Sequence, residues 1–169
     1  MSDGNGTTKH LVRTSTLDPA EAMHISHPHN EHSEIYLTRL SDPAGLTHLG
    51  ISLARIPAGR ESFALHRHTI QEEWIYVVSG RGHVRLDDHE VPIEAGDFVG
   101  FPAGGPAHLV RNTSPEDLVL LQGGDRRPGD RGHFPRLGKV AYQHDEGHMA
   151  LMDEGDVQLV PFSAWLVKT

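Results

Sequence analysis

The stretch 59-GRESFALHRHTIQEEWIYVVSG-80 decides how the fold of this chain is interpreted. It places His66 and His68 one residue apart, then two adjacent glutamates, and then the apolar run 74–78. Charged side chains beside a buried segment are costly unless they are paired or bind a metal. Residues two apart on a strand leave the same face, so one metal ion can accept both imidazoles. The stretch therefore predicts a metal site on a buried strand.

The residues around the histidine pair strengthen this prediction. Glu72 or Glu73 can supply a hard oxygen ligand that neutralises part of the ion's charge in a low-dielectric interior. A further ligand is expected from a neighbouring strand. The stretch 96-GDFVGFPAGGPAHLVRN-112 offers His108 for this role, directly after a turn of Pro, Ala and Gly.

Short segments rich in β-forming residues flank the predicted site. Gly, Pro and Asp separate them at nearly regular spacing, which is typical of an antiparallel sandwich or barrel. The expected strands cover residues 47–57, 82–86, 90–93, 97–101, 107–112 and 117–122. The following segment 123–138 is so rich in Gly, Pro and Arg that we expect no sheet pairing there.

Two sets of residues resemble the two sequence motifs of the cupin superfamily. The first set comprises Gly59, His66, His68, Glu73 and Gly80, with its first spacer one residue longer than usual. The second set comprises Gly96, Pro102, Gly104, His108 and Asn112, with one extra residue before the histidine. The chain thus resembles a small single-domain metal-binding cupin.

This resemblance implies an all-β fold, the double-stranded β-helix or jelly roll, with the metal inside the barrel. In cupins two histidines, a glutamate and a later histidine bind the ion, which carries these roles to His66, His68, Glu73 and His108. Glu73 is preferred because six residues separate it from Gly80, as the motif requires. Glu72 is the alternative in register and would otherwise point away.

Three imidazoles and one carboxylate are expected to hold one divalent transition metal per chain. Such a set leaves one or two positions open on a five- or six-coordinate ion, as a catalytic site requires. Iron, manganese and nickel are ranked first, and zinc, cobalt and copper also suit these ligands. The sequence assigns no general acid or base beyond the metal ligands.

The function expected from this site is enzymatic, with the metal acting on a small oxygenated substrate. The reaction is either an oxygenation or Lewis-acid chemistry of the isomerase or lyase type. The chain also looks like small bacterial cupins described as sugar-phosphate isomerases. The alternative is a non-catalytic protein that binds or senses a small molecule with the help of the metal.

The length of 169 residues suits one domain with extensions. We expect an N-terminal extension over residues 1–46 with a disordered start, and a cupin barrel over 47–123. A C-terminal loop and tail over 124–169 is expected to pack on the barrel or on a partner. Edge strands and the family resemblance favour a homodimer.

Composition excludes several classes of partner and site. A net charge of −8, from 15 basic against 23 acidic residues, argues against nucleic acid and membranes as partners. Cysteine is absent, so a metal must be bound through nitrogen and oxygen. Neither a signal peptide nor an apolar membrane segment is visible, so we expect a cytoplasmic location.

A second group of histidines lies in 24-HISHPHNEH-32. Pro28 interrupts the periods of both a helix and a strand, so these residues define no single face. We expect a solvated loop for His24, His27, His29 and His32. A second metal site in this loop is the alternative.

Overall fold

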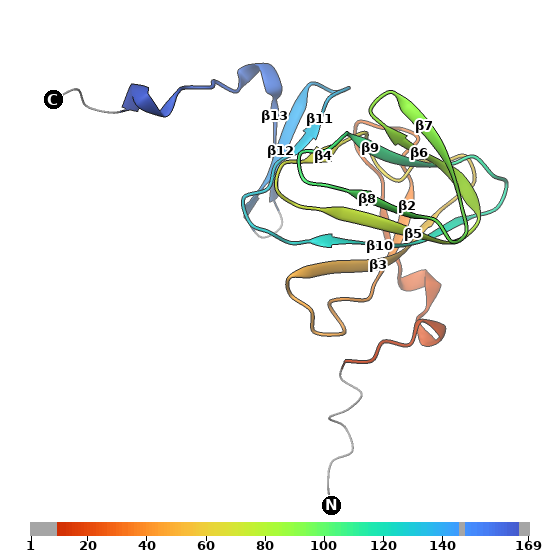
Figure 1. Ribbon diagram of the computed structural model, residues 1–169. Coiled ribbons are helices and arrows are strands. Elements are labelled where there is room, and N and C mark those ends of the chain that lie inside the picture. Colours follow the sequence, from red (N-terminus) through yellow and green to blue (C-terminus); the bar gives the residue numbers. More distant parts are fainter. Residues whose placement is uncertain (1–9, 146–147, 166–169) are drawn as a thin grey trace, which may run out of the picture.

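The computed structural model describes residues 10–145 and 148–165, and strands dominate these segments (Figure 1). The largest sheet is antiparallel and has the order β1-β2-β3-β10-β5-β8. Its strands are β1 (Met23–Ile25), β2 (Ile35–Arg39), β3 (Leu49–Ile56), β10 (Leu118–Asp125), β5 (Glu73–Ser79) and β8 (Phe98–Phe101).

A second sheet lies opposite the first and has the order β7-β6-β9. Its strands are β7 (His89–Glu94), β6 (Arg81–Leu86) and β9 (His108–Asn112). The core fills the space between the two sheets, where Val77 and Leu120 meet Val84 and Val110. Burial of these side chains is the main force that holds the two sheets together. The predicted all-β jelly roll is confirmed.

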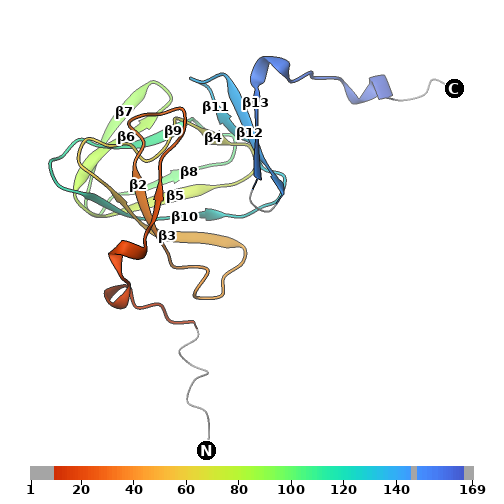
Figure 2. The same ribbon diagram turned by 180° about the vertical axis from the view of Figure 1, so that it is seen from behind.

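A third sheet, with the order β13-β12-β11-β4, packs at one end of the barrel (Figure 2). Its strands are β4 (Arg67–His68), β11 (Gly132–Phe134), β12 (Lys139–Asp145) and β13 (His148–Asp153). The prediction that pairing stops within residues 123–138 is therefore wrong. β10 continues to Asp125 because its glycines admit a close neighbour: a Cβ on Gly123 would lie 2.8 Å from the Trp74 ring.

The first sheet also extends beyond the predicted start of the barrel at residue 47. β1 and β2 come from the segment 1–46, and β2 pairs with β3. Ile35 and Leu37 pack against the main core, which explains why this segment joins the sheet. The predicted disorder of the first residues concerns 1–9, which lie outside the described residues.

Between residues 10 and 165, the described chain contains four short 3-10 segments. They are η1 (Thr14–Thr16), η2 (Pro19–Glu21), η3 (Glu154–Asp156) and η4 (Phe162–Trp165). In the described part of the chain, no helical segment has the length and hydropathy that a bilayer crossing requires. From η3 to Trp165 the chain runs away from the barrel in both views, and Trp165 is 73% exposed.

The two faces of β5 have different surroundings. Ile75 and Val77 point into the core, whereas Tyr76 and Val78 are exposed on the outer face. On the neighbouring β8, Phe98 is 65% exposed and stacks on the ring of Trp74 from β5. A homodimer partner that covers this apolar face stays a prediction.

Candidate metal centre

Three strands bring the predicted metal donors together. His66 and His108 face each other across an antiparallel bridge, with backbone hydrogen bonds of 3.2 and 2.7 Å. His68 lies in β4, two residues further along, and Glu73 is the first residue of β5. Because side chains two apart share a face, His66, just before β4, and His68, within it, both point to the start of β9.

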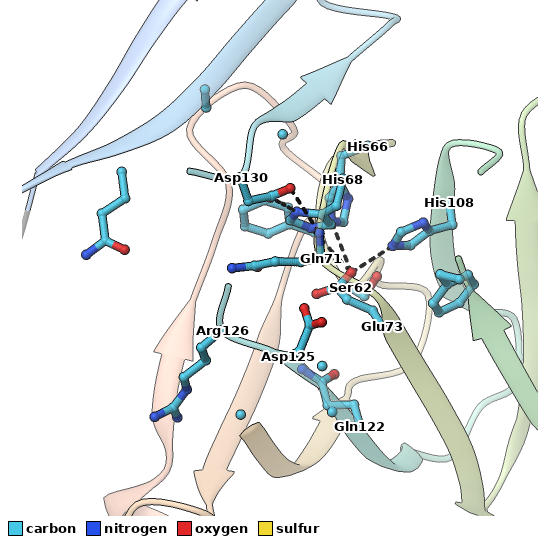
Figure 3. A pocket seen from close by; sticks show the side chains of 18 of the residues that line it. Ser62, His66, His68, Gln71, Glu73, His108, Gln122, Asp125, Arg126 and Asp130 are labelled. Carbon is cyan, nitrogen blue, oxygen red and sulfur yellow. Dashed lines mark hydrogen bonds and ion pairs between the residues drawn. The ribbon is translucent and has the colours of Figure 1, made fainter. Parts of the chain in front are cut away.

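The imidazole nitrogens converge on one carboxylate oxygen (Figure 3). Oε2 of Glu73 lies 3.7 Å from Nε2 of His66, 3.4 Å from Nε2 of His68 and 3.0 Å from Nε2 of His108. The donor atoms of His66, His68 and Glu73 all lie within 4.8 Å of one another. The alternative donor Glu72 is exposed, and its backbone amide donates a hydrogen bond to Asp125.

The carboxylates of the cluster are ionised and one imidazole carries a charge. Burial alone would raise the pKa of Glu73, but hydrogen bonds from His108, His66 and His68 hold it well below its usual range. Burial opposes the charged form of His68, yet Glu73 and Asp130 outweigh it and raise the pKa of His68 to about 9. Burial lowers the pKa of His108, against its hydrogen bond with Glu73.

The outer nitrogens of two imidazoles are fixed by acceptors. Nδ1 of His66 lies 2.8 Å from the carbonyl oxygen of Ala64, and Nδ1 of His68 lies 2.5 Å from Oδ2 of Asp130. Each Nδ1 therefore donates its hydrogen outward, which leaves the inner Nε2 as the ligand atom. His108 is oriented by stacking on Phe101, at 3.9 Å between ring centroids.

Asp130 is the site residue that sequence analysis missed. It lies between β10 and β11, and its Oδ1 accepts hydrogen bonds from the backbone amides of Ile70 and Gln71. Burial alone would raise the pKa of Asp130, but the hydrogen bonds from His68 and these amides keep it below its usual value. No motif spacing points to this residue, because it reaches the site only through the pairing of β11 with β4.

These residues fit a divalent transition metal. The donor set combines borderline nitrogen ligands with one hard oxygen, and the outer acceptors give two imidazoles the required tautomer. The side chains of His66, His68 and His108 are only 13, 19 and 8% exposed, whereas Glu73 keeps 37%. The cluster is thus shielded on the histidine side and open on the side of the carboxylate.

Metal affinity should depend on pH through His68. Below a pKa of about 9 the ion must displace the proton from Nε2 of His68, so affinity should rise about tenfold per pH unit from about pH 7 to about pH 9. Above the pKa of His68 the increase should level off. Competition with a chelator of known affinity, measured for Zn(II) at several pH values, checks this. A flat profile would contradict a charged His68 in the metal-free protein.

The cluster forms part of the wall of a cavity of about 1130 Å³. Residues from the first and third sheets, from β9 of the second sheet and from the connecting loops line this cavity. Its charged side chains are Glu73, Asp125, Asp130, Arg126, Arg127 and Arg131. Arg126 pairs with Asp42 and Arg127 pairs with Asp125, both at 2.5 Å. Arg131 has no ion-pair partner within the described chain.

The second histidine group divides between cavity and surface. His29 and His32 are exposed, as the loop prediction expects, but His27 is only 7% exposed and lines the cavity. The prediction of a solvated loop is therefore wrong for His27, because Phe63 and Phe134 pack against its ring. It is also wrong for His24, which lies in β1 and stacks on Tyr36. Among residues 10–145 and 148–165, the group of possible metal ligands consists of His66, His68 and Glu73, and this loop contributes none.

Comparison with known proteins identifies a family and a relative that agree with the β-barrel fold. The profile of the cupin domain family matches residues 52–122. An oxalate-binding protein of Thermotoga maritima is 31% identical over 123 residues, which are 72% of this chain and 95% of that protein.

Two solved structures are also similar along most of their length. A protein from Acidithiobacillus ferrooxidans, which its name proposes to be a sugar phosphate isomerase, is 34% identical with a TM-score of 0.84. That likeness covers 92% of this chain and 99% of the other. A protein from Silicibacter pomeroyi named as a sugar phosphate isomerase is 28% identical with a TM-score of 0.68, over 75% and 80% of the two chains.

Proposed function

This chain belongs to the cupin superfamily, and from that premise we propose that it is a metal-dependent enzyme for a small, anionic, oxygen-rich substrate. The favoured reaction is an isomerisation of a sugar phosphate. The observation that carries the proposal is the opening of the donor cluster onto a large cavity with arginines in its wall. Two relatives with sugar phosphate isomerase in their names support the choice of substrate class.

Charge supports an anionic substrate. Three arginines and three carboxylates line the cavity, and Arg126 is also paired with Asp42. A divalent ion at the donor cluster then leaves one positive charge in excess, which attracts an anion. Arg131 is the arginine of this wall that no described carboxylate neutralises, so we assign it to the substrate anion.

Size supports a substrate larger than a two-carbon acid. Sites for small organic ligands usually measure about 300–1,000 Å³. The cavity here is about 1130 Å³ and has long apolar walls that include Phe63, Phe134 and Leu120. Apolar walls lower the local dielectric constant, which strengthens polar contacts inside the cavity.

The roles of the chain's residues follow from their positions. A divalent ion would be held by His66, His68, Glu73 and His108 and would supply Lewis-acid polarisation of a substrate carbonyl or hydroxyl oxygen. The apolar walls shield the reacting atoms, and Arg131 would hold the anionic end of the substrate. Asp130 keeps the proton of His68 on the outer nitrogen.

A second candidate function is binding without turnover. The oxalate-binding relative favours it, since that protein is named for a ligand and not for a reaction. A divalent ion held by the same donor cluster would offer its open positions to the two carboxylates of a small diacid. Oxygenation remains a further reaction type that this ligand set permits.

The test is turnover by protein purified without a histidine tag and loaded separately with Fe(II), Mn(II) or Ni(II). We expect interconversion of aldose and ketose monophosphates, followed by NMR, which stops after chelation of the metal. Consumption of oxygen in step with substrate would indicate an oxygenase instead. Tight binding of oxalate without any turnover would indicate a binding protein.

An arginine variant sharpens this test. Arg131→Gln should raise KM for the phosphate substrate about tenfold or more, since a charge-assisted hydrogen bond contributes about 1.5–3 kcal/mol. Metal content should not change. Arg136→Gln is the matched control, because Arg136 is exposed, lies outside the cavity and faces Asp88 at 3.9 Å. Equal KM values for both variants would contradict the role of Arg131.

A further inference from the structure

His27 reaches the cavity from a part of the chain outside the cupin domain profile. It lies in the loop between β1 and β2, whereas the profile begins at residue 52. Its side chain is buried and lines the same cavity as the donor cluster. The loop between β1 and β2 thus adds a polar group to the cavity, whereas the metal donors come from residues 66–108.

Hydrogen bonds fix the loop that carries His27. The backbone amide of His27 donates to Oγ of Ser33 at 3.1 Å, and its carbonyl accepts from the amide of Asn30 at 3.0 Å. The side-chain amide of Asn30 in turn donates to Glu61 at 2.8 Å and to the carbonyl of Phe63 at 2.7 Å. These contacts tie the loop to the barrel, so the imidazole is held in place before any ligand arrives.

The hydrogen bonds also define the tautomer of His27. The backbone amide of His29 donates to Nδ1 of His27 at 3.2 Å, so Nδ1 is an acceptor and the proton resides on Nε2. Within the described chain, Nε2 has no hydrogen-bond partner. Nε2 also keeps some contact with solvent, because the buried polar atoms without a partner do not include it. The Nε2–H group is therefore open to the cavity.

Two phenyl rings connect His27 with the donor cluster. Phe63 and Phe134 lie 4.6 and 5.3 Å from the His27 ring, and 5.4 and 5.9 Å from the His66 ring. His27 thus shares two neighbours with His66 without belonging to the metal donors. Burial, followed by the nearby His29 and His66, lowers the pKa of His27, which keeps the ring neutral and able to donate.

We propose that His27 donates a hydrogen bond from Nε2 to a substrate oxygen beyond those that contact the metal. The substrate must then be long enough to reach from the donor cluster past the phenyl rings to His27. A chain of several oxygenated carbons meets this condition, whereas a two-carbon dicarboxylate spends both carboxylates on the metal. The inference deepens the proposed function and rests on it.

The test compares two ligands on protein loaded with Zn(II). Dissociation constants for oxalate and for aldose and ketose monophosphates of four to six carbons are measured by calorimetry. His27→Phe keeps an aromatic ring beside Phe63 but removes the donor, so we expect sugar phosphate binding to weaken about tenfold. Oxalate binding and metal content should stay as in the wild type. His27→Gln, which retains a side-chain N–H donor, should recover most of the affinity.

Two controls separate this role from a structural one. His32→Phe makes the same change in the same loop, at a side chain that is 65% exposed, and should alter neither constant. In the wild type, the Nε2 resonance of His27 should shift on addition of the sugar phosphate and not on addition of oxalate. This measurement needs no variant, so it holds even if His27→Phe fails to fold.

The outcomes distinguish the inference from the function on which it rests. Equal sugar phosphate binding by wild type and His27→Phe, with no shift of the Nε2 resonance, overturns the role of His27 alone. Equal weakening of oxalate and sugar phosphate overturns it as well, because the effect would then act through the metal centre. A wild-type protein that holds Zn(II) but binds neither ligand overturns the proposed function together with the role of His27.

Discussion

Replacing His66 and His108 together by Ala should reduce the bound transition metal from about one ion per chain to background. Both imidazoles point Nε2 at Oε2 of Glu73, from the two sides of one antiparallel bridge. Without them, His68 and Glu73 are the remaining donors of the cluster. Elemental mass spectrometry on protein purified without a histidine tag measures the effect directly.

Thermal unfolding gives a second measure of the same change. A ligand that binds only the folded state stabilises it by about 2.7 kcal/mol at a free concentration one hundred times its dissociation constant. Addition of metal should therefore raise the unfolding temperature of the wild type and leave that of the double variant unchanged. Chelation should remove the increase.

A matched control uses two histidines that do not line the cavity. His83→Ala with His89→Ala removes the same number of imidazoles from β6 and β7, away from the cavity lining. This protein should keep its metal. Equal metal in both double variants, or none in the wild type after reconstitution, would contradict the metal centre and the enzymatic proposal.

The part of the site that sequence predicts is the part built by local spacing. His66 and His68 share a face because they are two apart beside one short strand, and Gly80 ends β5 with a φ of +86°. A Cβ on Gly80 would lie 2.7 Å from the carbonyl oxygen of Asp117, so this turn needs glycine. Such constraints act over a few residues and leave a pattern in the sequence.

The part that sequence misses depends on pairing between distant segments. Asp130 meets His68 because β11 pairs with β4, although 62 positions separate the two residues. His27 enters the cavity because β1 and β2 join the main sheet and Asn30 anchors their loop to the barrel. Glycine-rich composition suggested that residues 123–138 do not pair, but at Gly123 the missing side chain makes room for Trp74.

Replacing Asp130 by Asn should weaken metal binding about 10- to 100-fold, the usual effect of losing a carboxylate behind a metal-binding histidine. In the wild type, Oδ1 of Asp130 accepts from the amides of Ile70 and Gln71, while Oδ2 faces Nδ1 of His68. In the variant the amides keep the side-chain oxygen, so the NH2 group faces His68. Nδ1 of His68 then becomes an acceptor, and its proton moves to Nε2, the nitrogen that should bind the metal.

The pH of the measurement decides how large this effect is. Against burial, Glu73 and then Asp130 raise the pKa of His68 to about 9, so this pKa should be lower in the variant and the proton should compete less with the metal. The weaker competition from the proton offsets some of the lost metal affinity at about pH 7. The ratio of the variant's dissociation constant to that of the wild type should therefore increase toward about pH 9. Titration with Co(II), followed by its visible spectrum, reports affinity and ligand geometry together. Asp117→Asn is the control, since the side chain of Asp117 is 44% exposed and pairs with Arg55 at 3.0 Å. A variant at Asp130 with wild-type affinity at both pH values would mean that the backbone alone orients His68.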